Sequence, residues 1–182
     1  RSFLDFRRSA VSESRDAALR TIILEPDAQG RAQALVEVLR SNQIEVGRTA
    51  EARRVRATAY GETERRAMEI PAGSWVVDLA QPQGRLARAI LEPDAELPQA
   101  FIEEELAARR EGRSDRFFDV TAWSLPYTFR VAAWWTGEAV AAEPVDGVNP
   151  SPGSPVPDHA GYAYDFEPVQ ESSYRLLAAL LA

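Results

Sequence analysis

The stretch RTIILEPDAQGRAQALVEVLRSNQIEV, residues 20–46, decides the fold that the sequence predicts. Its first five residues, Arg20 to Leu24, contain a continuous β-branched run closed by Glu25-Pro26, which is typical of a strand buried on both faces. Asp27 can cap the helix that follows, and Gln43–Val46 before Gly47 predicts a second strand. Strand, helix and strand with short joints predict a βαβ unit with parallel strands and a right-handed crossover. The helix carries an apolar stripe of Ala32, Leu35, Val36, Val38 and Leu39.

Further elements follow along the chain. Alternating small and polar residues around Gly61-Glu62 predict a hairpin, and SWVVDL predicts a third buried strand. The predicted fold class is therefore α/β, with a mostly parallel sheet, flanking helices and a β-hairpin. The ranges are 55–60 and 65–70 for the hairpin, 74–79 for the third strand, 81–93 and 97–113 for two helices, and 127–135 for a further strand.

The chain divides into four predicted segments. Residues 1–15 place apolar side chains at helical spacing, so we expect a short amphipathic helix that packs its apolar face against another surface. Residues 16–142 form the α/β domain. Residues 143–159 hold five prolines, which cannot pair inside a sheet and predict a polyproline-like connector. Residues 160–182 predict the start of a second strand–helix unit.

A partial repeat concerns the end of the sequence. Glu167-Pro168 aligns with Glu25-Pro26 at an offset of 142 residues (167 minus 25), and apolar positions match on both sides. The second copy ends at Ala182 without the returning strand that a βαβ unit needs, so we expect the native polypeptide to continue beyond it. A chance likeness between two ordinary strand–helix units is the alternative.

Composition excludes several classes of site. Among the 182 residues there is no cysteine and one histidine, His159, which excludes thiolate zinc sites, cysteine nucleophiles and sites with several imidazoles. All 21 basic residues are arginine, which also excludes Schiff-base lysines and Walker-type phosphate loops. The formal net charge of −7 argues against a nucleic-acid partner, and no apolar run is long enough to span a membrane.

The remaining candidates each have a simpler structural interpretation. Asp119 is expected to bond local backbone donors, and the pair Asp158-His159 to be solvated at the edge of the connector. The acids Asp94, Glu96 and Glu103–Glu105 have no partner that would separate their pKa values. We therefore assign no catalytic, cofactor-binding or metal-ligating residue. Core packing explains the aromatic cluster better than a binding platform: Phe117, Phe118, Trp123, Tyr127, Phe129, Trp134 and Trp135.

Four motifs carry a family resemblance: IPAGSWVV at 70–77, AQP at 80–82, AILEP at 89–93 and FDVTAWSLP at 118–126, of which DVTAWSLP is the most specific. They resemble the region after the catalytic domain in bacterial M14-family zinc carboxypeptidase-like proteins. Residues 20–46 and the restart at 161 are also similar to the glutamine-amidotransferase-like α/β segment of such proteins. The resemblance implies an amidotransferase-like or flavodoxin-like sheet. The amidotransferase nucleophile has no counterpart, because the chain lacks cysteine.

The resemblance implies that zinc and the peptidase chemistry belong to a domain upstream of Arg1, with residues 1–15 as its link. The family's His-x-x-Glu and later His have no counterpart here, so this chain holds no cofactor and is not itself expected to catalyse. Its leading interpretation is a non-catalytic accessory region that packs on or covers the peptidase domain of the same polypeptide, next to its peptide substrate. Export to the periplasm or exterior is implied by the resemblance alone.

Two other interpretations stay open. The chain could be a stand-alone module that binds a small ligand or peptide outside the carboxyl ends of the strands ending near residues 24, 46 and 79. An apolar cleft with convergent arginine and aromatic groups would favour that role, whereas a flat apolar face around Trp134 or the first helix would favour docking. A hydrolase that uses carboxylates alone is the third interpretation.

Overall fold

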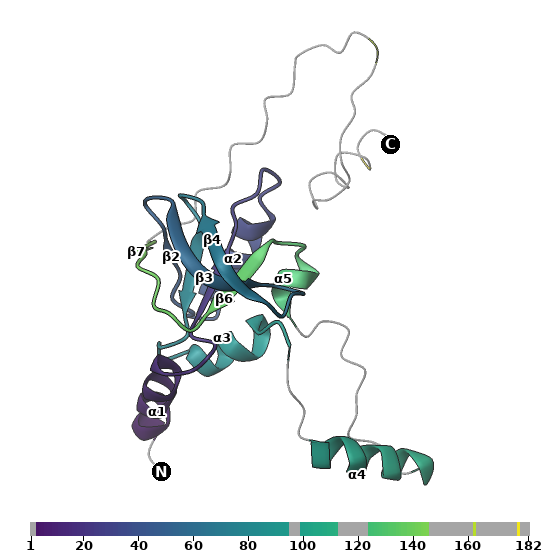
Figure 1. Cartoon of the computed structure of the whole chain (residues 1–182). Coiled ribbons are helices and arrows are strands. Elements are labelled where there is room, and N and C mark those ends of the chain that lie inside the picture. Colours follow the sequence, from purple (N-terminus) through teal and green to yellow (C-terminus); the bar gives the residue numbers. More distant parts are fainter. Residues whose placement is uncertain (1–2, 95–98, 113–123, 146–161, 163–177, 179–182) are drawn as a thin grey trace.

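The computed structural model describes residues 3–94, 99–112, 124–145, 162 and 178 (Figure 1). Its described strands form one seven-stranded sheet in the order β4-β3-β6-β1-β5-β2-β7. The strands are β1 (Thr21–Leu24), β2 (Gly47–Arg48), β3 (Arg53–Ala59), β4 (Arg65–Ile70), β5 (Trp75–Asp78), β6 (Ala133–Thr136) and β7 (Glu143–Pro144).

Every pairing in this described sheet is antiparallel. The predicted mostly parallel α/β sheet, amidotransferase-like or flavodoxin-like, is therefore wrong. The strands β1 and β2 do run in the same direction, since each is antiparallel to β5, but β5 lies between them. The other side of β1 pairs with β6. Hydrogen-bonding partners that come from later in the chain thus replace the direct parallel pairing that the βαβ pattern predicted.

Several element boundaries also differ from the prediction. The predicted strand at 43–46 is wrong, because β2 comprises only Gly47–Arg48. The strand predicted over 127–135 is wrong in its first part, where the helix α5 (Leu125–Thr128) precedes β6. The hairpin is confirmed as β3 and β4, and the third buried strand is confirmed as β5.

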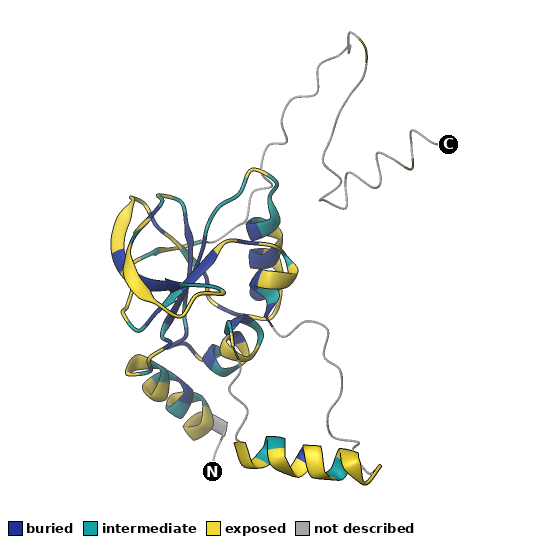
Figure 2. Cartoon of the chain, turned by 45° about the vertical axis from the view of Figure 1, so that its right-hand side comes forward, coloured by how far each residue is buried: buried dark blue, intermediate teal, exposed yellow. Residues whose placement is uncertain are grey.

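One face of the sheet is covered by helices. The helices α2 (Arg31–Ser41), α3 (Gly84–Leu91) and α5 contribute side chains to the larger apolar core, and Figure 2 shows buried positions concentrated where α2 and α3 face the strands. Ile22 and Leu24 point into this core from β1. The helix α1 (Phe3–Arg15) packs on α3, whereas α4 (Gln99–Arg110) lies apart from the sheet (Figure 1).

The opposite face of the sheet has a smaller core. Side chains alternate between the two faces of a strand, so Ile23 joins this second cluster with Val55, Ala57, Ile70 and Trp134. All four residues of β1 are buried, which confirms the prediction of a strand enclosed on both faces. The adjacent tryptophans on β6 are also divided, because Trp134 lies in the smaller core and Trp135 packs against the larger one.

The predicted cap of α2 is confirmed. Asp27 Oδ1 accepts hydrogen bonds from the backbone N–H groups of Gln29 and Arg31 at 3.0 and 3.1 Å, and Oδ2 accepts one from Ala32 at 2.7 Å. Burial alone would raise the pKa of Asp27, but these backbone bonds and the Arg31 guanidinium outweigh burial and hold its pKa below the ordinary value of 3.8. The ionised carboxylate therefore stabilises the folded state.

A close approach of α3 to the end of β5 requires glycine at position 84. A Cβ atom on Gly84 would lie 1.9 Å from the carbonyl oxygen of Leu79, which is backbone and cannot rotate away. Leu79 is itself fully buried, so its backbone cannot shift without disturbing the larger core. The position of α3 on the sheet thus depends on this missing side chain.

Several predicted segments lie outside the described residues. These are residues 113–123, which hold most of the FDVTAWSLP motif, the connector beyond Val145, and all of 160–182 except Tyr162 and Ala178. The division into 1–15, 16–142, 143–159 and 160–182 therefore stays a prediction, as does the partial repeat. A helix within 1–15 is confirmed as α1.

We expect Asp27→Ala to lower the free energy of unfolding by about 1 kcal/mol at neutral pH, the usual cost of losing a helix cap. Because the folded-state pKa is lowered, the contribution of Asp27 is present above the unfolded pKa and is lost as the pH falls through the folded value. Urea unfolding at pH 7 and near pH 2.5 measures this difference. Asp16→Ala, at an exposed position, is the control, and an equal loss at both pH values contradicts the assignment.

We expect Gly84→Ala to destabilise the fold by about 3 kcal/mol, because α3 must move away from Leu79 to make room for the new methyl group. Gly112→Ala is the matched control: its backbone has φ of 68° and strains any side chain, but the described structure leaves the space around it open. That control is expected to cost about 1 kcal/mol. Equal midpoints for the two variants in urea unfolding would show that the close approach is unimportant.

Candidate functional site

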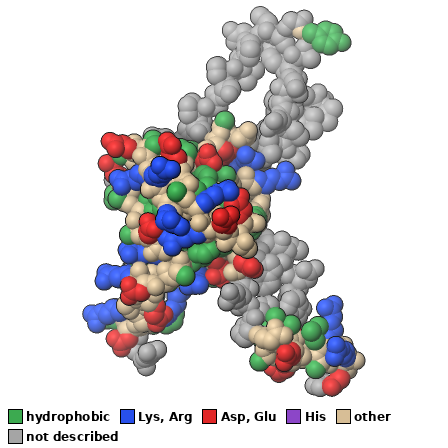
Figure 3. Space-filling model, viewed as in Figure 1, with side chains coloured by type: hydrophobic (Ala, Val, Ile, Leu, Met, Phe, Trp, Pro, Cys, Tyr) green, Lys and Arg blue, Asp and Glu red, His purple; other side chains and the backbone are tan. Residues whose placement is uncertain are grey.

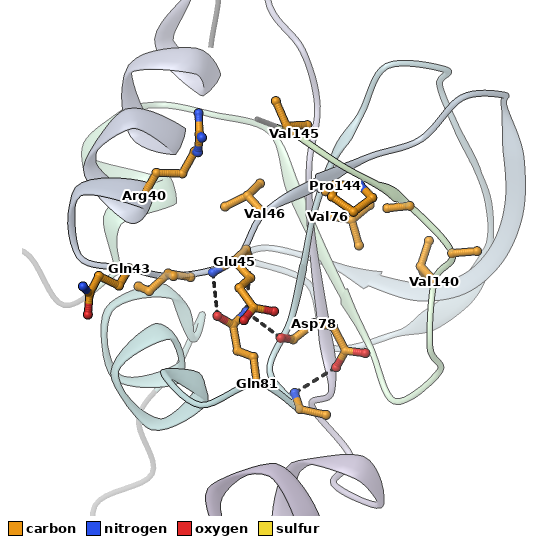
Figure 4. Close-up of a pocket in the computed structure, with 15 residues that line it drawn as sticks. Arg40, Gln43, Glu45, Val46, Val76, Asp78, Gln81, Val140, Pro144 and Val145 are labelled. Carbon is orange, nitrogen blue, oxygen red and sulfur yellow. Dashed lines mark hydrogen bonds between the residues drawn. The ribbon is translucent and has the colours of Figure 1, made fainter. Parts of the chain in front are cut away.

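A pocket of about 640 Å³ lies at the β2–β7 edge of the sheet (Figure 4). Its walls come from the end of α2, the approach to β2, the end of β5 and the segment around β7. The side chains that line it are Arg40, Gln43, Ile44, Glu45, Val46, Val76, Asp78, Ala80, Gln81, Val140, Ala141, Ala142, Pro144 and Val145, together with Gly47.

The pocket exists because the short strand β2 pairs over only two residues. On one side Gly47 pairs with Val76, and on the other with Pro144. A Cβ atom on Gly47 would lie 2.7 Å from the Ala142 Cβ and 3.1 Å from the Glu143 carbonyl oxygen, so glycine allows the β7 segment to approach this closely. The chain before Gly47 is in neither ladder, and the pocket opens there.

Gln81 holds the unpaired chain in place. Its Oε1 accepts a hydrogen bond from the Glu45 backbone N–H at 2.6 Å. Its Nε2 donates to the Glu45 carbonyl at 3.0 Å and to the Asp78 carbonyl at 2.7 Å. Gln81 is 4% exposed, so these bonds satisfy an amide that would otherwise be buried without partners. One side chain therefore links β5 to the approach of β2 where ladder bonds are missing.

Three charged side chains of the described residues line the pocket. Asp78 Oδ2 accepts a hydrogen bond from Arg20 Nη2 at 3.2 Å, and Asp78 Oδ1 accepts one from the Ala80 backbone N–H at 2.8 Å. Glu45 is exposed, and its carboxylate has no bonded partner among the described residues. Arg40, from the last turn of α2, lies on the opposite side of the pocket from Asp78 in Figure 4. The described part of the lining thus carries two negative charges and one positive charge.

Apart from the charged residues and the glutamines Gln43 and Gln81, the described lining is apolar. Val46 and Val145 belong to or pack against the larger core, and Val140 packs against the smaller one. The pocket therefore reaches around the sheet edge between the two faces. Val76 and Pro144 lie beside these residues in Figure 4, and the carboxylates of Glu45 and Asp78 lie on one side of them.

The sequence predicted a binding site outside the strand ends near residues 24, 46 and 79, and the pocket coincides with only part of that position. Val46 lines the pocket, and Leu79 lies between two residues that do, Asp78 and Ala80. Leu24, however, pairs with Trp75, whereas Asp78 pairs with Thr21, so Leu24 lies at the opposite end of β1 and β5. The prediction that three carboxyl ends converge is wrong because it assumed parallel strands. Among the described residues, one arginine, Arg40, and no aromatic side chain line the pocket.

The aromatic residues predicted as a cluster have different environments. Trp134 is buried, and Trp135 and Phe129 are partly buried against the larger core. Tyr127 is about half exposed, with its ring centroid 5.5 Å from that of Tyr60. Phe117, Phe118 and Trp123 lie outside the described residues. Of the described members, Trp134, Trp135 and Phe129 pack in or against the cores, whereas Tyr127 does not. Trp134 is itself buried, so it does not present the exposed docking face that the sequence left open.

The acidic candidates are not brought together in the part of the chain that the structure describes. Glu103 accepts a hydrogen bond from Gln99 within α4, Asp94 is exposed, and Glu105 on α4 is buried. Glu96, Asp119, Asp158 and His159 lie outside the described residues. Among those described, no three His, Cys, Asp or Glu side chains are grouped so as to hold a metal ion.

Tyr60 is the described tyrosine most strongly affected by its environment. Burial raises its pKa well above the ordinary value of 10, and Tyr127 and Glu92 raise it further. Its hydroxyl donates a hydrogen bond to the Leu91 carbonyl at the end of α3, which Ser124 Oγ also contacts at 3.3 Å. The neutral phenol therefore joins α3 to the sheet as a structural hydrogen-bond donor.

Comparison of the chain with protein-family models, with curated proteins and with solved structures finds no match in any of the three. The resemblance to M14 carboxypeptidase-like proteins therefore stays a prediction that rests on local motifs. Over the described residues, none of the helices has the length and apolar character needed to cross a membrane.

Little in the sequence indicates that the pocket residues would lie together. The sequence around Gln81 predicts the start of a helix and belongs to a resemblance motif, but nothing local pairs Gln81 with Glu45, which is 36 positions away. Val140–Val145 came at the border of the predicted connector. A buried glutamine is recognisable only when its hydrogen-bond partners are known.

We expect Gln81→Leu to lower the free energy of unfolding by about 1–3 kcal/mol, because the substitution leaves the Glu45 backbone groups and the Asp78 carbonyl without their partner. Gln83→Leu is the control, since that amide makes only a 3.5 Å contact to the Asn42 carbonyl. Urea unfolding measures both, and hydrogen exchange of the Glu45 amide reports the local effect. Unchanged exchange in Gln81→Leu contradicts the proposed link.

Proposed function

We propose that this chain is a non-catalytic accessory region of an M14-type zinc carboxypeptidase-like protein, and that it packs on the peptidase domain through α1. The local motifs support the choice of parent family, and the arrangement of α1 supports the mode of attachment. In this proposal the zinc and the peptide-hydrolysing groups belong to the upstream domain. The chain contributes a surface that covers or shapes access to it.

The observation that carries the proposal is the way α1 is held. Arg85 of α3 donates to the Phe6 carbonyl at 3.1 Å, to Ser9 Oγ at 3.0 Å and to Glu13 Oε2 at 2.7 Å. Its guanidinium also lies 4.3 Å from the centroid of the Phe6 ring. One arginine thus fixes the helix on the rest of the fold.

The fixed helix keeps large apolar side chains in solvent. Leu4 is 62% exposed and Phe6 is 54% exposed, although Ala10 on the same helix is buried. Burying a large apolar side chain is favourable by about 1.5–3 kcal/mol, so a rigid helix that presents two of them supports a contact with another domain. We infer that this face contacts the peptidase domain.

A second candidate function is supported by the pocket. A volume of about 640 Å³ falls within the range of small-molecule sites, roughly 300–1,000 Å³, and apolar walls with a few polar groups are their usual lining. The chain would then bind a small ligand or a peptide without acting on it chemically. The two functions use different surfaces and are compatible.

The accessory proposal requires a His-x-x-Glu motif and a later histidine in the reading frame upstream of residue 1. We expect the chain to bind the domain encoded there, and Leu4→Ser to weaken that binding about tenfold. Phe6 is left unchanged in this test because its ring contacts the Arg85 guanidinium. Calorimetric titration of the two purified parts measures it. Leu106→Ser on α4, which is 49% exposed, is the matched control.

Three results would overturn the accessory proposal. One is an upstream region without the zinc motif. Another is an equal effect of the α1 and α4 substitutions. The third is stoichiometric zinc, by elemental analysis, or peptide cleavage in the isolated chain.

A further inference from the structure

We propose that the pocket at the β2–β7 edge binds a guanidinium or ammonium group carried on an aliphatic stem, as in a basic peptide side chain. This inference rests on the second candidate function and names its ligand class. The observation that supports it is the position of Glu45 and Asp78 next to the valine side chains between β5 and β7.

The charge of the lining selects a cation. Glu45 and Asp78 together outnumber Arg40, and Glu45 has no bonded partner in the described structure. Asp78 is partly compensated by Arg20, whose Nη2 lies 3.2 Å from Oδ2, but the Asp78 side chain keeps 39% of its surface exposed. It therefore retains room for a second donor. A guanidinium or ammonium group offers several donors, enough to bond more than one carboxylate oxygen.

Hydrogen bonds hold the backbone that carries these acids. Gln81 holds the Glu45 backbone and the end of β5 together, and Asp78 Oδ1 accepts the Ala80 N–H. Because the backbone at both positions is held, a ligand has to order mainly the Glu45 side chain, and this lowers the entropy lost when the ligand binds. The positive and negative side chains are otherwise interspersed over the face seen in Figure 3, without a single-sign region that would attract a polymer.

The apolar wall selects the stem. Val76, Val140 and Pro144 lie next to the carboxylates, and they suit the methylene groups of an arginine or lysine side chain, which bury their stems while the charged head stays polar. The pocket is larger than one such side chain, so neighbouring peptide groups also fit. A free amine and a peptide share this chemistry, and the binding experiment separates them.

The test is titration calorimetry of the full chain with four probes. They are free arginine, agmatine, an N-acetylated and C-amidated Gly-Arg-Gly peptide, and the same peptide with citrulline, which keeps the shape of arginine without its charge. We expect saturable binding of the arginine peptide or of agmatine, weaker binding of the citrulline peptide, and a loss of affinity as salt is raised.

Variants assign the binding to the pocket. Glu45→Gln, at an exposed position, is expected to weaken binding about two- to fivefold, the range for a solvent-accessible ion pair. Ala141→Arg, also exposed, adds bulk and positive charge to the lining and is expected to abolish binding. Glu64→Gln, on the β3–β4 turn away from the pocket, is the matched control and should leave affinity unchanged. Circular dichroism verifies that each variant is folded.

The outcomes distinguish a failure of the cation inference from a failure of the ligand-binding function. Equal affinity for the arginine and citrulline peptides, with binding still lost in Ala141→Arg, overturns the cation inference and leaves a ligand-binding pocket. No binding of any probe at millimolar concentration overturns both. Binding of agmatine and free arginine alone assigns the site to small amines, whereas binding of the peptide alone assigns it to a polypeptide.

Discussion

The pairing of β1 with β5 on one side and with β6 on the other is the constraint on which the rest of this structure depends. It encloses the TIIL strand completely and places Ile22 and Leu24 in one core and Ile23 in the other. It also separates β1 from β2, so the helix α2 connects two strands that are not neighbours. The arrangement of helices on a single face and the small core on the other both follow from this strand order.

The parts of the fold that were predictable depend on neighbours in sequence. The hairpin of β3 and β4 follows from alternation around a glycine turn, and the Asp27 cap follows from one carboxylate placed before a helix. Strand order was not predictable, because Ile22 pairs with both Val77 and Trp135, which come from distant segments. A strand–helix–strand pattern is equally compatible with a third strand inserted between its two strands, and local periodicity does not distinguish these cases.

The pocket is a consequence of the same topology. The strand β2 meets β5 and β7 over two residues, and a glutamine amide takes the place of the next ladder bonds. Gly47 removes the side chain that would separate β2 from the β7 segment. Neither feature is visible from composition, which could not place Glu45 beside Asp78. Sites built by long-range pairing become recognisable only after the partners are known.

The two outer strands of the described sheet differ in how they resist association with another sheet. The strand β7 is two residues long and ends in Pro144, which has no N–H to offer an incoming strand. The strand β4 is six residues long and relies instead on the exposed charges of Arg65, Arg66 and Glu69. Electrostatic protection is screened by ions whereas a missing donor is not. Any edge-to-edge aggregation of this protein should therefore begin at β4 and increase with ionic strength.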